Sequence, residues 1–510
     1  MSFRQVVPGL LLAFSLISAP AFAAPPEQAR AEPGGGGGVL SLLPPDAVSD
    51  HVLNVDGKSI AYTATAGTLN LFGQDGQRSA AIFYTAYVAK NRDAGRPVTF
   101  VFNGGPGAAS AFLNLGLVGP RILDFGPDGR DGANAKLVDN PRSWLDFTDL
   151  VLIDPIGTGW SRTVKPDDQN EFYSVESDAE SLAKAIALYV AHSGRAASPK
   201  YILGESYGGF RSVKVANSLR EDQGILVFGI VMLSPLLEGR FVFGGSDDAL
   251  DAALELPSLA AAELERQNAF SDKAVQDAQA FALNEYLPVL AGSQPSGDAG
   301  RAFYGRVAKL TGIPEDVVAK NQGFLGSVYR KHSDGSGGEV ASAYDASFLA
   351  PDPYPESESE HGGDPILDGF VRAYGGAFSS YARDELGFRT DMTYTLLSTS
   401  VNRQWKWGGR NDGGSRLNAG VTDDLKELLS LSPSFRLMVG QGYSDLVIPF
   451  GVNKYVLDHM PSAFADRVAL KLYRGGHMFY TRPVSRELFT TDAKAFFATQ
   501  PQAAPAVKSN

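Results

Sequence analysis

Hydrophobic and polar positions along the chain follow two different periods. Short alternating runs between residues 51 and 89, such as SIAYTATAG and SAAIFYTAYVA, predict an antiparallel ribbon because DG and QDGQ turn signals separate them. From residue 98 the pattern changes to continuous apolar runs, TFVF, DLVLID, KYILG and GIVMLS, with helical periodicity between them. Apolar strands that alternate with amphipathic helices predict an α/β fold, with a mostly parallel central sheet flanked by helices.

The strand pattern is interrupted and then returns. Between residues 236 and 395, helix-like stretches such as LAAAELERQNAF and FVRAYGGAFSSYA replace the apolar runs, and they predict a mostly helical cap insertion over the carboxyl edge of the sheet. The strand pattern returns in FRLMVGQG and VALKLYRGG. The core is therefore predicted in two parts, residues 46–235 and residues 396–500.

The amino-terminal residues 1–23 have the pattern of a secretory signal peptide. Arg4 precedes the apolar stretch VVPGLLLAFSLISAP, and Ala21-Phe22-Ala23 forms a small-x-small cleavage site. The mature chain would begin at Ala24, in the periplasm or outside the cell. An uncleaved membrane anchor is the alternative, but two prolines bracket a segment that is already short for a membrane span.

Two further segments lack apolar periodicity. Residues 24–45 are rich in Ala, Pro and Gly and predict a flexible linker, and residues 501–510 form a tail. The acidic segment 351–365, PDPYPESESEHGGDP, suggests a cation site, but a solvated loop is the favoured interpretation.

Composition excludes several functions. The 510 residues carry a formal net charge of -12, which works against binding to nucleic acid. The absence of cysteine removes disulfides and thiolate chemistry, and six histidines without a clustered pair predict neither a metal nor a cofactor. The sequence does not indicate an oligomeric state.

The strongest local signal is the segment Gly204-Glu205-Ser206-Tyr207-Gly208-Gly209. It lies between the strand-like KYIL and the helix-like FRSVKVANSLR. A GxSxG turn between a strand and a helix exposes a serine hydroxyl above the sheet of an α/β hydrolase. We therefore interpret Ser206 as a nucleophile, rather than as a helix-capping serine in a Gly-rich turn.

A serine nucleophile needs a base, and proteins with this turn order their partners as Ser, then Asp or Glu, then His. Of the two late histidines, His477 follows the strand-like VALKLY in a Gly-Gly turn, whereas His459 lies in a helical pattern. Asp445 follows FRLMVGQG in a loop, and Asp458 is a helical alternative. We predict His477 as the base and Asp445 as the carboxylate that orients it.

The tetrahedral intermediate of such a reaction needs backbone amides that stabilise its oxyanion. The amide of Tyr207, directly after the nucleophile, supplies one. The loop Asn103-Gly104-Gly105-Pro106-Gly107 follows a predicted strand, and Gly105 is a plausible second donor. A plain tight turn is the alternative for this loop.

With these motifs in order, the chain resembles the serine carboxypeptidase family. Five segments carry the resemblance: VFNGGPGAAS, LVLIDPIGTGWS, ILGESYGG, GYSDLVIPFGV and RGGHM. The resemblance implies the triad and the oxyanion amides given above. It also implies that Asn103, the Gly104 amide and Glu205 bind the terminal carboxylate of a peptide, and that Met478 lines the leaving-group pocket.

The chain departs from the family pattern at several positions. Val101 replaces the usual tryptophan, NGGPGCSS reads NGGPGAAS, and Leu117 stands where a second glutamate partners the carboxylate-binding one. These departures weaken the expected carboxylate site.

The predicted function is an exported serine carboxypeptidase, favoured at acidic pH, whose partner is a peptide with a free C-terminus. Acid favours it because two carboxylates share a hydrogen bond only when one of them is protonated. An esterase or acyltransferase with the same triad is the alternative, and a catalytically silent binding protein is a third interpretation. The roles of Trp405 and Trp407, at the cleft or in packing, stay open.

Overall fold

The computed structural model describes most of the chain after residue 37. The predicted signal peptide, most of the predicted linker and the tail lie outside the described residues. The described residues are 38–55, 57–91, 95–126, 129–245, 247–335, 337–408 and 414–499.

A ten-stranded sheet forms the centre of the described chain. Its first four strands pair antiparallel, and every pair from β7 onward is parallel. The order along the sheet is β1 (Ala47–Val55), β2 (Lys58–Phe72), β3 (Arg78–Ala89), β7 (Asp149–Ile153), β4 (Val98–Phe102), β9 (Lys200–Glu205), β10 (Gly229–Leu233), β13 (Arg436–Gly442) and β14 (Val468–Tyr473), while β8 (Arg162–Thr163) pairs with β3.

The central strands are buried on both faces, as their continuous apolar sequences predict. Every residue of β4, β7, β9 and β10 is buried, whereas exposure alternates along the edge strand β1. Neighbouring residues of one strand point to opposite faces. Val101 and Leu203 accordingly belong to one hydrophobic cluster, and Phe100 and Ile202 belong to another.

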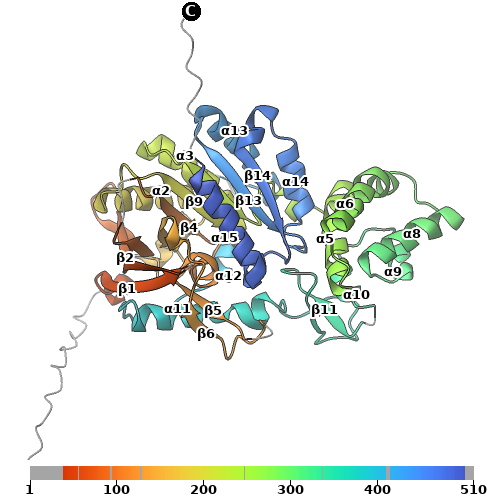
Figure 1. Ribbon diagram of the computed structural model, residues 1–510, viewed down its shortest axis with the longest axis horizontal. Helices are drawn as coiled ribbons and strands as arrows, with labels where there is room; N and C mark the ends of the chain where they lie inside the picture. The colour runs from red at the N-terminus through yellow and green to blue at the C-terminus, as the bar shows by residue number, and fades with distance from the viewer. Residues whose placement is uncertain are drawn as a thin grey trace, which may run out of the picture. The chain divides into compact units, whose positions relative to one another are not determined.

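Helices cover both faces of the sheet (Figure 1). Residues of α2, α3, α13 and α14 join the cluster on one face, and residues of α11 and α15 join the cluster on the other. This architecture is that of an α/β hydrolase, as the sequence predicts. The helices are α2 (Val175–His192), α3 (Tyr207–Gln223), α11 (Ala373–Asp384), α13 (Thr422–Leu431), α14 (Phe450–Asp458) and α15 (Pro483–Ala498), with the short α1 (Ala111–Leu113) and α12 (Thr399–Gln404).

The segment predicted as a cap packs in two different ways. Its first part buries a hydrophobic cluster of its own around Leu256, Tyr286 and Tyr329, and its helices form a green group in Figure 1. In its second part, Phe378 of α11 packs against Phe83 and Trp160 of the main core. The first part contains α4 (Arg240–Phe243), α5 (Ala249–Arg266), α6 (Asp272–Phe281), α7 (Leu287–Ala291), α8 (Gly297–Thr311), α9 (Glu315–Lys320), α10 (Tyr329–His332), β11 (Glu339–Ala341) and β12 (Leu349–Pro351).

Two smaller features complete the fold. The strands β5 (Arg121–Asp124) and β6 (Lys136–Asp139) form a separate antiparallel hairpin. Among the described helices, none combines the length and the apolar character needed to cross a membrane.

Candidate active site

Ser206 lies at the sharp turn between β9 and α3. Its backbone has φ 60° and ψ −126°, a conformation that is strained for a residue with a side chain. The glycines around it are needed because the backbone closes on itself. A Cβ atom on Gly204 would lie 2.0 Å from the carbonyl oxygen of Gly208, and one on Gly208 would lie 2.7 Å from that of Phe102.

His477 and Asp445 follow adjacent parallel strands, β14 and β13, and they meet at the same edge of the sheet. His477 Nδ1 lies 2.9 Å from Asp445 Oδ2. Gln441 Nε2 donates to the same oxygen at 2.8 Å, and the amides of Val447 and Ile448 donate to Oδ1 at 2.9 Å. The buried carboxylate is therefore held in one orientation, and a neutral His477 that donates from Nδ1 keeps Nε2 free to accept a proton.

The surroundings of His477 favour its charged form on balance. Burial alone would lower the pKa of His477, but the charge and hydrogen bond of Asp445, together with the charge of Glu205, raise it above its usual value. The site can therefore stabilise the imidazolium that forms when His477 accepts a proton.

Asp458 and His459, the alternatives to Asp445 and His477, lie outside the pocket. Asp458, the last residue of α14, forms an exposed ion pair with Lys454 at 2.7 Å. His459 is also exposed, and its Nδ1 lies 2.7 Å from the carbonyl oxygen of Tyr455. Neither side chain lines the pocket that contains Ser206.

The Gly-rich loop after β4 lies against the turn that carries Ser206. A Cβ atom on Gly104 would lie 2.6 Å from the amide nitrogen of Tyr207, so the two segments are in close contact. Tyr207 is the first residue of α3, and amides of a first helical turn have no partner within the helix. Gly104 and Gly105 line the pocket together with Ser206. The two segments that carry the predicted oxyanion amides are thus in contact beside the pocket.

Glu205 is buried beside Ser206. Its Oε2 accepts hydrogen bonds from the Asn103 side-chain amide and from the hydroxyl of Tyr480, the latter at 3.1 Å. Its Oε1 is buried and has no hydrogen-bond partner within the described part of the chain. Burial raises the pKa of Glu205 to about 7, against the opposing effects of His477 and of the two donors. Glu205 is therefore a carboxyl group that is neutral in mild acid.

The pocket is small and its walls are mostly apolar. It has a volume of about 120 Å³ and combines Ser206, His477, Glu205, Asn103, Gly104 and Gly105 with Ala108, Phe112, Tyr344, Leu367, Leu397, Val447 and Met478. All predicted site residues except Asp445 and Tyr207 thus line one cavity, and Asp445 contacts the lining residue His477.

Sequence reasoning did not single out Tyr344 or Tyr480. The carbonyl oxygen of Tyr344, from the predicted insertion, accepts the backbone N–H of His477 at 2.6 Å, and the two rings meet edge to face at 5.4 Å. Tyr480 lies in the turn just after the base. Only its position three residues after His477 could have indicated it.

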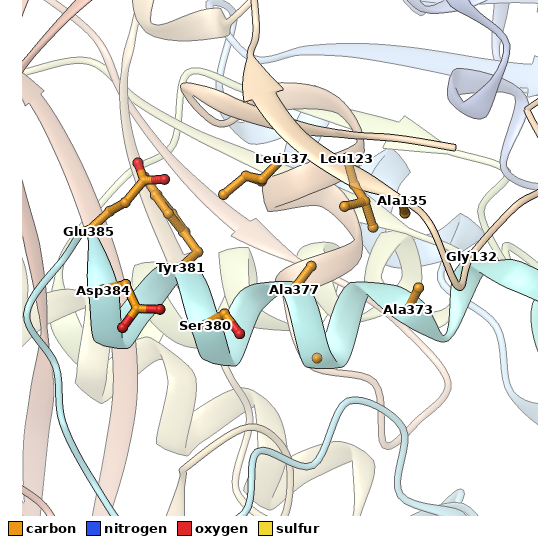
Figure 2. A pocket seen from close by; sticks show the side chains of 11 residues that line it. Leu123, Gly132, Ala135, Leu137, Ala373, Ala377, Ser380, Tyr381, Asp384 and Glu385 are labelled. Atoms are coloured by element: carbon orange, nitrogen blue, oxygen red, sulfur yellow. The ribbon is translucent and has the colours of Figure 1, made fainter. Parts of the chain in front are cut away.

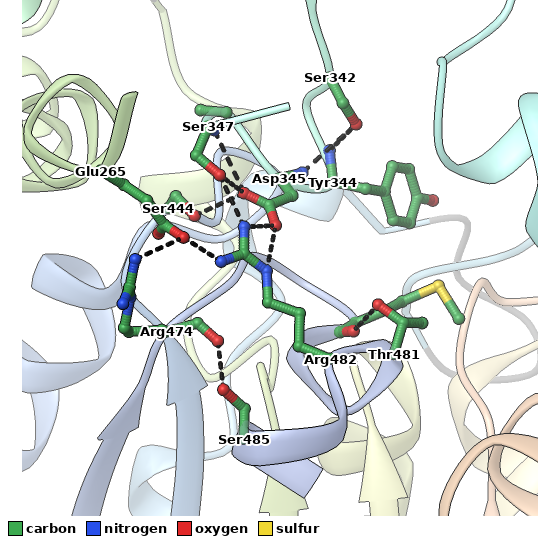
Figure 3. A network of polar contacts seen from close by, with 12 residues as sticks. Glu265, Ser342, Tyr344, Asp345, Ser347, Ser444, Arg474, Thr481, Arg482 and Ser485 are labelled. Atoms are coloured by element: carbon green, nitrogen blue, oxygen red, sulfur yellow. Dashed lines mark hydrogen bonds and ion pairs between the residues drawn. The ribbon is translucent and has the colours of Figure 1, made fainter. Parts of the chain in front are cut away.

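A polar network fastens the Tyr344 loop to the core (Figure 3). Asp345 accepts from Arg482 Nε at 3.0 Å and from Ser444 Oγ at 2.7 Å. Arg482 also pairs with Glu265 of α5. The insertion is therefore tied to the segments that carry both Asp445 and His477.

A larger hollow, of about 500 Å³, lies between the β5–β6 hairpin and α11 (Figure 2). Its carboxylates are already paired, Glu385 with Arg121 at 3.2 Å and Asp384 with Arg383 at 2.8 Å. It contains none of the predicted catalytic residues. The small pocket, not the large hollow, has the chemistry of an active site.

The sequence left open the roles of Trp405 and Trp407 and of the acidic segment 351–365. Trp405 and Trp407 pack edge to face on the ring of Tyr207, with centroids 5.3 and 5.5 Å apart. In the acidic segment, Glu360 pairs with Arg330 at 2.5 Å, and Asp352 pairs with Lys331. The tryptophans therefore support the turn at Ser206, and these two acidic side chains are engaged by cations of the protein itself.

Comparison with known proteins agrees with this geometry. The family model described as serine carboxypeptidase matches residues 62–223, about a third of the chain, which includes Asn103, Glu205 and Ser206. The resemblance to the serine carboxypeptidases is confirmed. The rest of the chain, with Asp445 and His477, lies outside this match.

Curated relatives show the same similarity over short segments. The vitellogenic carboxypeptidase of Aedes aegypti is 32% identical over 139 residues, which cover 26% of this chain and 27% of the relative. A carboxypeptidase Y homolog of Arthroderma benhamiae is 26% identical over 185 residues, 36% of this chain and 33% of the relative. The serine carboxypeptidase-like 35 protein of Arabidopsis thaliana is 29% identical over 145 residues, 28% of each chain. The chain thus spans about a third of the length of such relatives.

Solved structures resemble the chain more distantly. A proline iminopeptidase of Mycobacterium smegmatis aligns with 85% of this chain and 97% of its own at 14% identity, with a TM-score of 0.40. A second structure, VinJ, aligns with 85% of this chain and 99% of its own at 16% identity and a TM-score of 0.38.

Proposed function

We propose that this protein is an exported serine carboxypeptidase that removes the C-terminal residue of peptides through an acyl-enzyme on Ser206. One observation carries the proposal. A buried carboxyl group, Glu205, lies directly beside the candidate nucleophile and has one oxygen without a partner within the described residues. Burial of an acid with an unpaired oxygen costs free energy, and a hydrogen bond to a substrate carboxylate would offset that cost.

The proposed reaction begins when Ser206 Oγ attacks the scissile carbonyl carbon and His477 Nε2 accepts the hydroxyl proton. The amides of Gly105 and Tyr207 stabilise the oxyanion, and Asp445 stabilises the imidazolium. His477 then gives the proton to the departing amine, which leaves an ester on Ser206. Water attacks this ester, its proton passes to His477 and then to Ser206, and the shortened peptide departs.

Recognition of the free C-terminus is assigned to Glu205, Asn103 and the Gly104 amide. A neutral Glu205 donates its O–H to the substrate carboxylate, whereas the ionised form repels it. Because the pKa of Glu205 is about 7, we expect tight recognition below that pH and its loss above it. Protonation of Glu205 also removes one of the charges that raise the pKa of His477, so the base stays neutral to lower pH.

An esterase or acyltransferase with the same triad is the second candidate. It is favoured by Leu117, which is fully buried where the resembled family has a second glutamate. Such an enzyme would form the same acyl-enzyme and ignore the free carboxylate.

The two candidates are separated with matched substrates. An N-blocked dipeptide with a free carboxylate is compared with its C-terminal amide and with an ester of the same acyl group, at pH 5. The proposal expects faster cleavage of the free acid than of the amide. Equal rates on both, with fast ester cleavage, would assign the esterase. Labelling of Ser206 by a fluorophosphonate tests the nucleophile in either case. If the probe does not label the folded protein, the interpretation as a catalytically silent binding protein is favoured.

Export is proposed from the sequence of the first 23 residues. Expression in a bacterium, followed by mass spectrometry of the periplasmic fraction, is expected to find a chain that begins at Ala24. A full-length chain retained in the membrane would instead indicate an anchor.

A further inference from the structure

We propose that Tyr480 is a positioning residue that takes the place of the missing second glutamate and directs the proton of Glu205 toward the C-terminal carboxylate of the substrate. The inference rests on the proposed function and deepens it, because it names the side chain that makes carboxylate recognition possible at a site with a single acidic residue.

The first argument is the arrangement of donors around Glu205. Asn103 and Tyr480 both donate to Oε2, and Oε1 has no partner within the described residues. An oxygen that already accepts two hydrogen bonds is a poor site for a proton, because a hydroxyl there would meet two donors. The proton of the neutral acid therefore belongs on Oε1. Glu205 lines the pocket, and its unpartnered Oε1 is the oxygen that we assign as the donor to a substrate carboxylate.

The second argument is that Tyr480 stays a donor at every working pH. Burial, followed by the charge of Glu205, raises the pKa of Tyr480 well above its usual value. A second glutamate would itself titrate in the same range as Glu205. A tyrosine holds the acceptor oxygen without adding a second negative charge, which is an advantage in a site that must bind an anion.

The third argument is that the chain leaves room for this side chain. A Cβ atom on Gly116 would lie 2.7 Å from the ring of Tyr480 and 3.0 Å from the hydroxyl of Tyr374. Gly116 directly precedes Leu117, so the segment that has lost the glutamate also lacks the side chain that would exclude the Tyr480 ring. Tyr480 itself lies in η9 (Phe479–Thr481), the turn after His477, and its position is fixed with that of the base.

The groups that face Glu205 come from several elements. Asn103, Tyr480, His477 and Asp445 act on its pKa directly. The hydroxyls of Tyr344, from the insertion, and Tyr374, from α11, also sense its charge. Of these tyrosines, only Tyr480 donates a hydrogen bond to Glu205 within the described part of the chain.

The test is the Tyr480→Phe variant, with Tyr374→Phe as the matched control. The kcat/KM values of both variants and the wild type are measured from pH 4 to 9 on an N-blocked dipeptide as the free acid and as the C-terminal amide. Loss of the hydroxyl removes a donor that lowers the pKa of Glu205. We expect the alkaline limb of the Tyr480→Phe free-acid profile to move to higher pH and the maximum of the profile to fall about fivefold or more. The amide profile of this variant and both Tyr374→Phe profiles are expected to match wild type.

Three outcomes would overturn the inference. Unchanged midpoint and unchanged free-acid preference in Tyr480→Phe would show that the hydroxyl does not position Glu205. An equal loss on both substrates with an unmoved midpoint would show a purely structural role. A wild type without any preference for the free acid would overturn the proposed function first, and this inference with it.

Discussion

Asp445 is held by Gln441, Val447 and Ile448 as well as by His477. Its orientation is therefore set by the protein before His477 gains a proton. A buried carboxylate with fixed donors costs free energy to maintain, and a positive charge that forms beside it offsets that cost. The transfer of a proton from Ser206 to His477 creates such a charge.

The Asp445→Asn substitution tests this role. An asparagine of the same shape presents either an amide N–H or a neutral oxygen to His477, so the imidazolium loses its counter-charge and the correct tautomer is no longer enforced. We expect kcat to fall by roughly 10³- to 10⁴-fold. The control is Asp458→Asn at the exposed alternative, which is expected to keep wild-type kcat. Similar losses in both variants would contradict the assignment.

The pH profile tests Glu205. In the wild type, kcat/KM on free-acid peptides is expected to fall as the pH rises through about 7, where Glu205 ionises. A glutamine in its place stays neutral, so Glu205→Gln is expected to lose the alkaline limb. Its acid limb is expected to stay near the wild-type position, because wild-type Glu205 is already protonated there and adds no charge beside His477. If the alkaline limb persists unchanged in the variant, the ionisation of another group causes it.

At the scale of elements, the turn from β9 to α3 depends on the absence of side chains. The strand and the helix approach so closely that a Cβ atom on Gly204 would meet the backbone of Gly208, and one on Gly208 would meet the backbone of Phe102 at the end of β4. Backbone atoms cannot rotate away as a side chain can, so a methyl group there must move a strand or the helix.

We expect Gly204→Ala to lower the free energy of unfolding by at least about 1–3 kcal/mol, because its Cβ would lie 2.0 Å from a carbonyl oxygen. The matched control is Gly376→Ala in the exposed part of α11, where a Cβ atom meets nothing within 4 Å. Removal of glycine from a helix is expected to stabilise by about 0.5–1 kcal/mol. Denaturant unfolding measures both. A Gly204→Ala variant as stable as wild type would show that the turn has more room than the structure gives it.

The loop that carries Tyr344 depends on the insertion and the core together. The Asp345 side chain is only 9% exposed, and its carboxylate bridges Arg482 and Ser444, next to the Tyr344 carbonyl that accepts the His477 amide. Asp345→Asn is expected to lower the free energy of unfolding by about 1–3 kcal/mol and to lower kcat more than it raises KM. Asp384→Asn, in an exposed pair, is the control and is expected to change neither. A loss of stability with an unchanged kcat would show that this network does not position His477.

At the scale of the whole molecule, the sequence predicted the sheet well because its strands are apolar along their full length. DLVLID and KYILG became β7 and β9 almost residue for residue. Ser206, Asp445 and His477 each follow a strand, as the sequence predicts, and their catalytic roles stay predictions. The secretion signal and the domain boundaries stay predictions.

Other parts of the site could not be predicted. Tyr344 and Tyr480 reach it through tertiary packing between segments far apart in the chain, and neither lies in a periodic or glycine-rich pattern. Likewise, the α11 segment was predicted as part of the cap, but its aromatic face packs on the main core through Phe378. Periodicity tells which face of a helix is apolar, not which surface covers it.

The measurement that tests the central claim most directly is the release of the C-terminal amino acid from an N-blocked dipeptide between pH 4 and 8, with the wild type beside Ser206→Ala. The account predicts release that is faster below pH 7 than above it and that falls at least roughly 10³-fold in the variant. Release that survives in Ser206→Ala, or ester cleavage by the wild type without any release of amino acid, would contradict it.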